Sequence, residues 1–356
     1  MATSPVTVAV VGQGRSGFDI HVARLRNDPR FRIVAVADFD AGRREQSRQE
    51  LGCEVYPDHR AMLRKADAEL VIVSSYSFTH APIACEVLDS GRHALVEKPL
   101  AMNTTWFDRM IRARDRAGRH CFPFHNYRYG NEYVHLRDLM ANGPLGEIFE
   151  VRIRLLGFSR RNDWQTLRRY GGGVLNNTCP HFLDIALQFL GAPVAEVFTD
   201  LKLVANVGDV EDHVRVILKG TNGRIADMLV SSADAFPEPK WTILGSRGTA
   251  VCDGGTTRVK CCDPAQLQQG YRVVAGPSPG RSYDFNDTIP WQETELRVAD
   301  TKVPHDLHDN VYQVLREGAR QEIMLEDVRE VVRISEAARK KDGFYGGISR
   351  KINPEG

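Results

Sequence analysis

The sequence predicts an α/β plus α+β fold, with a doubly wound parallel sheet in residues 1–123 and a second α/β domain, built on a large, mostly antiparallel open sheet, in residues 124–356. Its 356 residues exceed what a single core of common size needs. The first third alternates Val- and Ile-rich runs with helical patterns, as a parallel sheet requires. Later expected strands follow one another through Gly-containing turns with no helix between them, which favours antiparallel pairing.

The expected strands of the first domain are nearly all apolar, as they are when helices cover both faces of a sheet. They are the runs TVAVVG, RIVAVADFD, LVIVSS and HALVEKP, and helices reaching Leu25 and Leu51 separate the first three. This alternation predicts the doubly wound arrangement.

The rhythm changes after HCFPFHNYRY, near residue 123. A helix is expected at about 131–142, followed by a strand in EIFEVRIRLLG, a Gly-rich loop and a helix opening near Thr178. The later expected strands are AEVFTDLKLV, DHVRVILKG, GRIADMLVSSA, KWTILGSRGTAVCDG and a further candidate, QGYRVVAG. From Val303 to Lys341 helical spacing returns, which predicts terminal helices that pack back on the body.

Charge and composition favour a small-molecule ligand. Lysine plus arginine (47) nearly cancels aspartate plus glutamate (46), so neither nucleic acid nor an anionic membrane is expected as a partner. The first residues do not read as a leader and no apolar run is long enough to span a bilayer, so a cytoplasmic location is expected. The seven cysteines include no C-x-x-C pair, so reduced thiols and no metal site are expected.

The segment after the first expected strand has the spacing G-x-G-x-x-G. Its members are Gly12, Gln13, Gly14, Arg15, Ser16 and Gly17. Between a strand and a helix, this spacing lets backbone amides at the helix N-terminus meet a pyrophosphate. Asp38 ends the second expected strand, at about the 20-residue offset of a ribose-binding acid. Residues 1–123 are therefore expected to form an NAD(P)-binding Rossmann domain.

Asp38 also predicts NAD rather than NADP, because a carboxylate would repel a 2′-phosphate. Arg43 and Arg44 lie close enough in sequence to soften that preference. Their alternative role is the exposed face of the second helix.

Four further segments complete a pattern that resembles one known family. They are Ser75 to His80, Glu97-Lys98-Pro99, Asn126-Tyr127-Arg128-Tyr129, and the run from Gly171 through Asn177 and His181 to Asp184. Together with the glycine motif and Asp38, they make nearly the whole chain similar to the Gfo/Idh/MocA family, named for glucose-fructose oxidoreductase and inositol dehydrogenase. Only the joint pattern is specific, since a tripeptide such as Glu-Lys-Pro is common.

The resemblance implies hydride transfer between NAD(P) and a hydroxyl or carbonyl carbon of a sugar-like polyol, with Lys98 and His181 beside the substrate. A neutral imidazole suits the removal of a hydroxyl proton, so His181 is the expected base. Lys98 is expected to stabilise the developing charge on oxygen, or to act as an alternate base. The cofactor should also contact Ser75, Tyr76, His80, Glu97, Lys98 and Asn126.

Two positions depart from the family pattern. Asn177 stands where the family usually has aspartate, and an amide cannot take up a proton at working pH. Asn177 is therefore expected to orient His181, to bind a substrate hydroxyl, or to cap the helix. Tyr76 stands where the family commonly has proline, and either stacks on the cofactor or forms part of the turn.

The loop FSRRNDWQTLRRYGGG mixes arginine, aspartate and aromatic residues before the expected catalytic helix. Trp164 could offer an apolar face to a sugar ring while arginine and Asp163 hydrogen-bond its hydroxyls, or the arginines could hold a carboxylate or phosphate bidentately. Trp164 and Arg128 are the residues most expected to bind the substrate. A solvated basic loop or a subunit contact is the alternative.

Several readings of function stay open at this stage. The substrate is expected to be a sugar, cyclitol, sugar acid or glycoside. The alternatives are a glycoside-processing enzyme in which NAD oxidises a carbon only transiently, and a non-catalytic NAD-binding regulator. The family also suggests a homodimer or homotetramer formed through the sheet of the second domain.

Overall fold

The computed structural model describes residues 4–341 except 270–271, 274, 278–280 and 282–286. Six parallel strands form the first sheet in the order β3-β2-β1-β4-β5-β6. Their bounds are β1 Val6–Val11, β2 Phe31–Ala37, β3 Glu54–Tyr56, β4 Leu70–Val73, β5 His93–Val96 and β6 Cys121–Pro123. The helical segments between them are η1 Arg15–Val22, α1 Ala23–Leu25, α2 Ala41–Leu51, α3 His59–Lys65, α4 His80–Asp89 and α5 Thr104–Ala117.

The apolar runs in the sequence explain this sheet. Every residue of β4 and β5 is buried, because helices cover both faces of the sheet. The predicted doubly wound parallel sheet is therefore confirmed.

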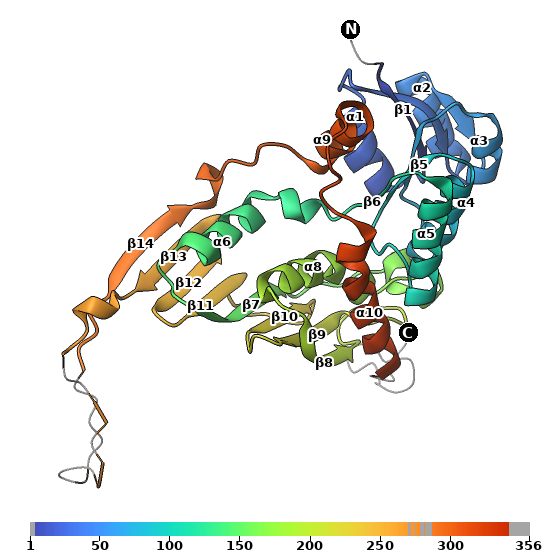
Figure 1. Ribbon diagram of the computed structural model, residues 1–356. Coiled ribbons are helices and arrows are strands. Elements are labelled where there is room, and N and C mark those ends of the chain that lie inside the picture. Colours follow the sequence, from blue (N-terminus) through green and yellow to red (C-terminus); the bar gives the residue numbers. More distant parts are fainter. Residues whose placement is uncertain (1–3, 270–271, 274, 278–280, 282–286, 342–356) are drawn as a thin grey trace.

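Eight strands form the second sheet in the order β14-β13-β12-β11-β7-β10-β9-β8. They are β7 Ile148–Leu156, β8 Val194–Lys202, β9 His213–Gly220, β10 Ile225–Ser231, β11 Trp241–Gly245, β12 Gly248–Asp253, β13 Thr256–Cys261 and β14 Gln292–Arg297. Helices α6 (Asn131–Asn142) and α8 (Cys179–Leu190) lie along one face of this sheet (Figure 1). All neighbours are antiparallel except β7 and β10, so the prediction of a mostly antiparallel sheet is confirmed.

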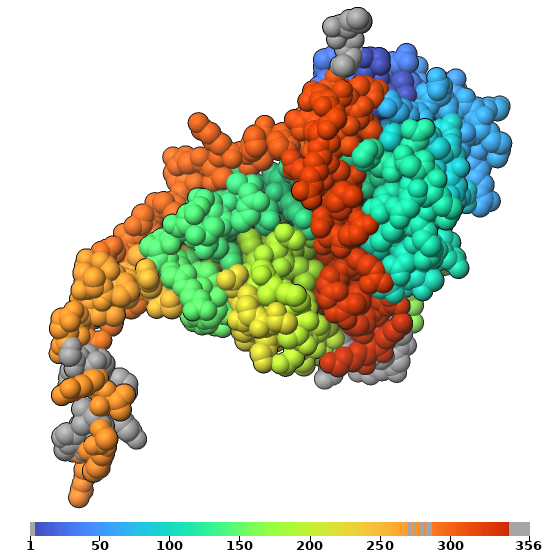
Figure 2. Space-filling model, viewed as in Figure 1, coloured from blue at the N-terminus to red at the C-terminus, as the bar shows by residue number. Residues whose placement is uncertain are grey.

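The C-terminal helices join the two parts of the molecule. Helix α9 (Leu307–Tyr312) packs into the core of the first sheet, and α10 (Leu325–Lys341) contacts both α5 and α8. Val328 and Val332 of α10 belong to the first core, whereas Val331 and Ile334 belong to the second. In Figures 1 and 2, this orange-red to red segment runs between the blue-to-teal part and the green-to-yellow part.

Several local expectations needed correction. The helix expected near Thr178 is preceded by a short helix, α7 (Val174–Asn177), and α8 begins at Cys179. The run KWTILGSRGTAVCDG forms a hairpin of β11 and β12, and β13 and β14 were not anticipated. In the candidate strand at 269–276, residues 270, 271 and 274 lie outside the described residues, and the described ones are not in a strand.

Among the residues that the structure describes, no helix is both long and apolar enough to cross a membrane.

Candidate active site

The glycine turn between β1 and η1 has the shape of a dinucleotide cradle. Gly12 has φ of +90°, and a Cβ there would lie 2.5 Å from the Ser74 carbonyl oxygen. A Cβ on Gly17 would lie 1.9 Å from the Gly12 carbonyl oxygen. Glycine is therefore required at both positions, one for the turn and one for the close approach of helix to strand. The turn follows the carboxyl end of β1 and so lies at the edge of the parallel sheet where ligands of such sheets bind.

Asp38 is held beside this turn at the end of β2. It is only 6% exposed, and its Oδ2 accepts a hydrogen bond of 2.7 Å from the Gln13 backbone N–H. Arg43 Nη1 lies 3.9 Å from the same oxygen, whereas Arg44 donates to the backbone carbonyls of Asp38 and Phe39. The Asp38 carboxylate is thus fixed beside the glycine turn, with one arginine close to it.

The turn after β4 is connected to the turn after β5 and to the loop before α7. His80 is nearly buried, and its ring nitrogens lie 3.0 Å from the Ser75 carbonyl oxygen and 2.9 Å from that of Pro99. Tyr76 stacks on Tyr170 at 4.7 Å and meets Trp164 edge-on at 5.1 Å. Tyr76 therefore belongs to an aromatic contact between the two parts of the molecule, which also includes Trp164.

Lys98 follows β5 and reaches α7. Its Nζ donates to the backbone oxygen of Asn177 at 2.8 Å and to Oδ1 of the same residue at 3.2 Å. Burial lowers the pKa of Lys98, the neighbouring Glu97 carboxylate opposes this, and the charges of Arg15 and Arg161 add to the lowering. Lys98 Nζ therefore lies in a confined site, in which the Glu97 carboxylate favours its charged form.

Asn177 ends α7, and its side chain is a hydrogen-bond acceptor for two donors. Besides Lys98, Gln165 donates from Nε2 to Asn177 Oδ1 at 3.1 Å. Helix α8 starts without a side-chain cap, so the structure places Asn177 against Lys98 and not as the cap of α8. Sequence reasoning missed Gln165, because a glutamine in a polar loop gives no signal that it will reach a residue on a helix.

His181 lies one turn further along and is nearly buried. The ring of Tyr127 stacks on it with a centroid distance of 4.1 Å, and His181 Nδ1 has no hydrogen-bond partner among the described residues. Burial lowers the pKa of His181 well below its ordinary value, and the charges of Lys98 and His125 lower it further. The imidazole is thus neutral near pH 7, as a proton acceptor must be.

The remaining predicted substrate residues are held by other side chains. Arg128 forms a bidentate ion pair with Asp184, at 2.7 and 2.6 Å, and Asp184 is 1% exposed. Asp163 accepts from the Gln165 backbone N–H and pairs with Arg161 at 2.6 Å. Arg128 therefore anchors α8 to the segment after β6, and Asp163 orders its own loop.

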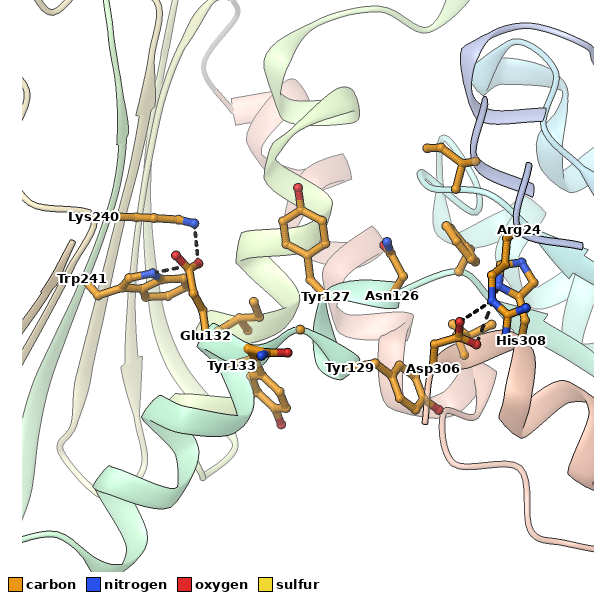
Figure 3. Close-up of a pocket in the computed structure, with 16 residues that line it drawn as sticks. Arg24, Asn126, Tyr127, Tyr129, Glu132, Tyr133, Lys240, Trp241, Asp306 and His308 are labelled. Carbon is orange, nitrogen blue, oxygen red and sulfur yellow. Dashed lines mark hydrogen bonds and ion pairs between the residues drawn. The ribbon is translucent and has the colours of Figure 1, made fainter. Parts of the chain in front are cut away.

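A cavity of about 610 Å³ opens beside Tyr127 (Figure 3). Asn126 and Tyr127 lie between a Glu132–Lys240 ion pair on the side of the second sheet and an Arg24–Asp306 ion pair on the side of the first. The Oδ1 atom of Asn126 is buried with no hydrogen-bond partner among the described residues. The cavity thus combines aromatic faces with paired charges.

Comparison with known proteins agrees with this geometry. The model of the oxidoreductase family with an NAD-binding Rossmann fold matches residues 6–125, and that of the GFO/IDH/MocA C-terminal domain matches residues 133–251. The inositol 2-dehydrogenase of Rubrobacter xylanophilus is 30% identical over 251 residues, which are 68% of this chain and 70% of that protein. The myo-inositol 2-dehydrogenase of Thermotoga maritima is 27% identical over 276 residues, which are 75% of this chain and 81% of that protein.

Among solved structures, an NAD-binding protein from Listeria innocua has a TM-score of 0.80 at 21% identity and covers 95% of both chains. The fold thus agrees with the two family models, which match residues 6–125 and 133–251. The chain belongs to the Gfo/Idh/MocA family of NAD-binding oxidoreductases.

Proposed function

We propose that the protein transfers a hydride between NAD and a ring carbon, as secondary alcohol or ketone, of a sugar, cyclitol, sugar acid or glycoside. The observation that carries the proposal is the meeting of Lys98 Nζ with Asn177 one turn before a buried, neutral His181. The inositol dehydrogenases among its relatives support a polyol as substrate.

The residues present fit NAD. The crowding at Gly12 and Gly17 leaves a turn whose amides are suited to a pyrophosphate, and the buried carboxylate of Asp38 is suited to ribose hydroxyls. Gln13, Gly14, Arg15 and Ser16 complete the turn, and Ser75, Tyr76, His80, Glu97 and Asn126 would border the rest of the cofactor. When bound, NAD supplies the hydride acceptor or donor.

Proton transfer is assigned to His181. Its imidazole is neutral near pH 7, so it can take up the proton of a substrate hydroxyl. The stacked Tyr127 ring fixes the plane of that imidazole. Lys98 would donate to the same substrate oxygen and stabilise its negative charge.

Asn177 stands where the family usually has an aspartate. Its amide takes up no proton at working pH, so Asn177 can orient the Lys98 side chain but cannot carry a proton. By accepting from Lys98 Nζ and from Gln165, it fixes the ammonium in place. Trp164 would hold the body of the substrate.

We also propose that the domains divide at residues 123/124 and that the protein is a homodimer or homotetramer. One face of the second sheet carries no helix of the described chain in Figure 1, and Phe198 on β8 is 50% exposed. Pairing of such faces would remove apolar surface from water. Sedimentation as a clean monomer would contradict the oligomer.

The test is NADH formation with NAD and a panel of sugars, cyclitols, sugar acids and glycosides, for the wild type, Lys98→Ala and His181→Ala. Turnover in the wild type alone supports the proposal. Binding of NAD without turnover on any compound would favour a regulator. Product formed without net NADH, from protein that copurifies with NAD, would favour the transient-redox alternative.

A further inference from the structure

The last helix, α10, carries an arginine that binds both segments joined by the Lys98–Asn177 hydrogen bonds. Arg339 Nη1 donates to Asn176 Oδ1 at 2.7 Å, and Nη2 donates to the backbone oxygen of Met102. Asn176 is the neighbour of Asn177 in α7, and Met102 follows Lys98 in the segment between β5 and α5. The guanidinium therefore forms a second connection between these segments, beside the one that the Lys98 side chain makes.

Asn176 passes this connection on to the glycine run before α7. The residue is 3% exposed, and its Nδ2 donates to the backbone oxygens of Gly171 and Gly172 at 3.2 and 2.9 Å. The oxygen and both hydrogens of the amide are thus used, which fixes its orientation. A Cβ on Gly171 would lie 3.1 Å from Met102 Sδ, so the glycine run packs directly on the segment between β5 and α5.

The helix that carries the arginine has a fixed place of its own. Figure 1 shows α10 beside α5 and α8, and Val332 belongs to the first core whereas Ile334 belongs to the second. On the same face as Arg339, Glu336 Oε2 accepts from the backbone N–H and the hydroxyl of Thr104, both at 2.8 Å. The position of α10 therefore does not depend on Arg339 alone, and the helix can hold the guanidinium against both segments.

The hydrogen bonds of Lys98 require such a fixed separation. Lys98 follows a strand of the first sheet, whereas Asn177 lies on a helix beside the second, so their distance is set by how the two parts of the molecule meet. The Nζ atom is 2.8 Å from the backbone oxygen of Asn177 and 3.2 Å from its Oδ1. Since hydrogen bonds from nitrogen to oxygen extend to only about 3.2 Å, a shift of about 1 Å between the segments would break both.

We propose that Arg339 is a positioning residue of the active site: by binding Met102 and Asn176 at once, it sets the separation at which Lys98 reaches Asn177. The arginine acts through these two residues and not on the reacting atoms. Only its consequence for turnover rests on the proposed function.

The first test needs no substrate. It measures how readily Lys98 is acetylated by acetic anhydride in the full-length protein, read by mass spectrometry, with the exposed Lys65 and Lys219 as references in the same molecule. Arg339→Met removes both donors and keeps a long side chain. Acetylation of Lys98 relative to the references should rise at least about threefold, because the broken hydrogen bonds no longer hold the amine against Asn177.

The matched control is Arg329→Met. Arg329 also lies on α10 and binds the first part of the molecule, through Asp108 of α5 at 2.8 and 2.9 Å, but no hydrogen bond joins it to α7 in the described chain. This variant should leave the relative acetylation of Lys98 unchanged. An unchanged value in folded Arg339→Met would overturn the proposal, as would an equal rise in Arg329→Met.

A second variant keeps the test decisive if Arg339→Met does not fold. Arg339→Lys retains the charge but lacks the fork that binds Asn176 and Met102 together, so Lys98 should again become more reactive. Wild-type reactivity in a folded Arg339→Lys would overturn the proposal. Failure of both variants to fold would reduce the arginine to a purely structural role and overturn it too.

Activity separates this proposal from the proposed function. Where turnover on the polyol panel is found, Arg339→Met should lower kcat about tenfold to a hundredfold, because a displacement of about 1 Å in a positioned group has that effect. The KM for NAD should stay nearly unchanged, since the arginine does not touch the glycine turn or Asp38. A wild-type kcat in Arg339→Met would overturn the proposal. A rise in Lys98 acetylation, in a protein without turnover on any compound, would support the role of Arg339 and count against the dehydrogenase.

Discussion

Replacing Glu211 by glutamine should make the protein more stable at alkaline pH and leave its stability in acid nearly unchanged. Glu211 precedes β9 and is 2% exposed, and its Oε1 accepts from the Leu175 backbone N–H at 2.9 Å in α7. Burial raises the pKa of Glu211 to about 7, although its backbone hydrogen bonds and Arg339 lower it. Glutamine offers the same acceptor without the charge.

The sign and size of this change in the free energy of unfolding follow from the difference in the Glu211 pKa between the folded and unfolded states. The pKa of the folded state lies above the ordinary value of 4.5, so the favourable contribution is complete below about pH 4.5 and is lost as the pH rises through about 7. One pKa unit corresponds to about 1.4 kcal/mol, so the wild type should lose about 3 kcal/mol of stability from this group between acid and about pH 8.5.

Denaturant unfolding at about pH 4.5 and about pH 8.5 measures the effect. Glu211→Gln should gain about 3 kcal/mol over the wild type at the higher pH and little at the lower. The control Glu196→Gln changes a side chain that is 69% exposed and should alter stability by less than about 1 kcal/mol at either pH. Equal stability differences for Glu211→Gln at both pH values would refute the reasoning.

Three further changes test other parts of the structure. Gly17→Ala should weaken NAD binding at least about tenfold in calorimetry, because its Cβ would lie 1.9 Å from the Gly12 oxygen, whereas Gly157→Ala, with nothing within 4 Å, should not. Arg128→Met should cost about 3 to 5 kcal/mol in denaturant unfolding, since it leaves the Asp184 carboxylate buried and unpaired; a loss below about 1 kcal/mol would contradict this. Asp38→Ser should move the ratio of NADP to NAD affinity at least about tenfold toward NADP, with Arg43 still in place, and an unchanged ratio would count against Asp38 as the ribose ligand.

The parts of the fold that are determined by residues close together in the sequence could be predicted. The helix expected at about 131–142 spans Asn131–Asn142, because its periodic apolar residues and the glycine at its end are local signals. The glycine turn and Asp38 follow strands whose apolar runs are equally local. Strand β14 was missed because its exposed sequence, QETELR, lacks the apolar alternation of a strand packed on a core.

Contacts between distant segments could not be predicted. Arg128 and Asp184 are 56 positions apart, and nothing in the NYRY segment indicates that the arginine will pair with an acid on α8 instead of facing the substrate. Lys98 and Asn177, which are joined by a hydrogen bond, are 79 positions apart in the sequence. Only the family pattern indicated that both lie near the substrate. The burial of Glu211 and the hydrogen bonds of Arg339 gave no signal at all, since a single charged residue in a sequence does not show which segments it will meet.

The central claim is that this site moves a hydride between a ring carbon and NAD. The most direct measurement uses myo-inositol and a methyl glucoside deuterated at every ring carbon, with mass spectrometry of the NADH formed in a single turnover. We expect one deuterium in the NADH from at least one of the two compounds in the wild type, and none in Lys98→Ala or His181→Ala. Absence of deuterium in NADH from a wild type that binds NAD and converts the same compound would contradict it.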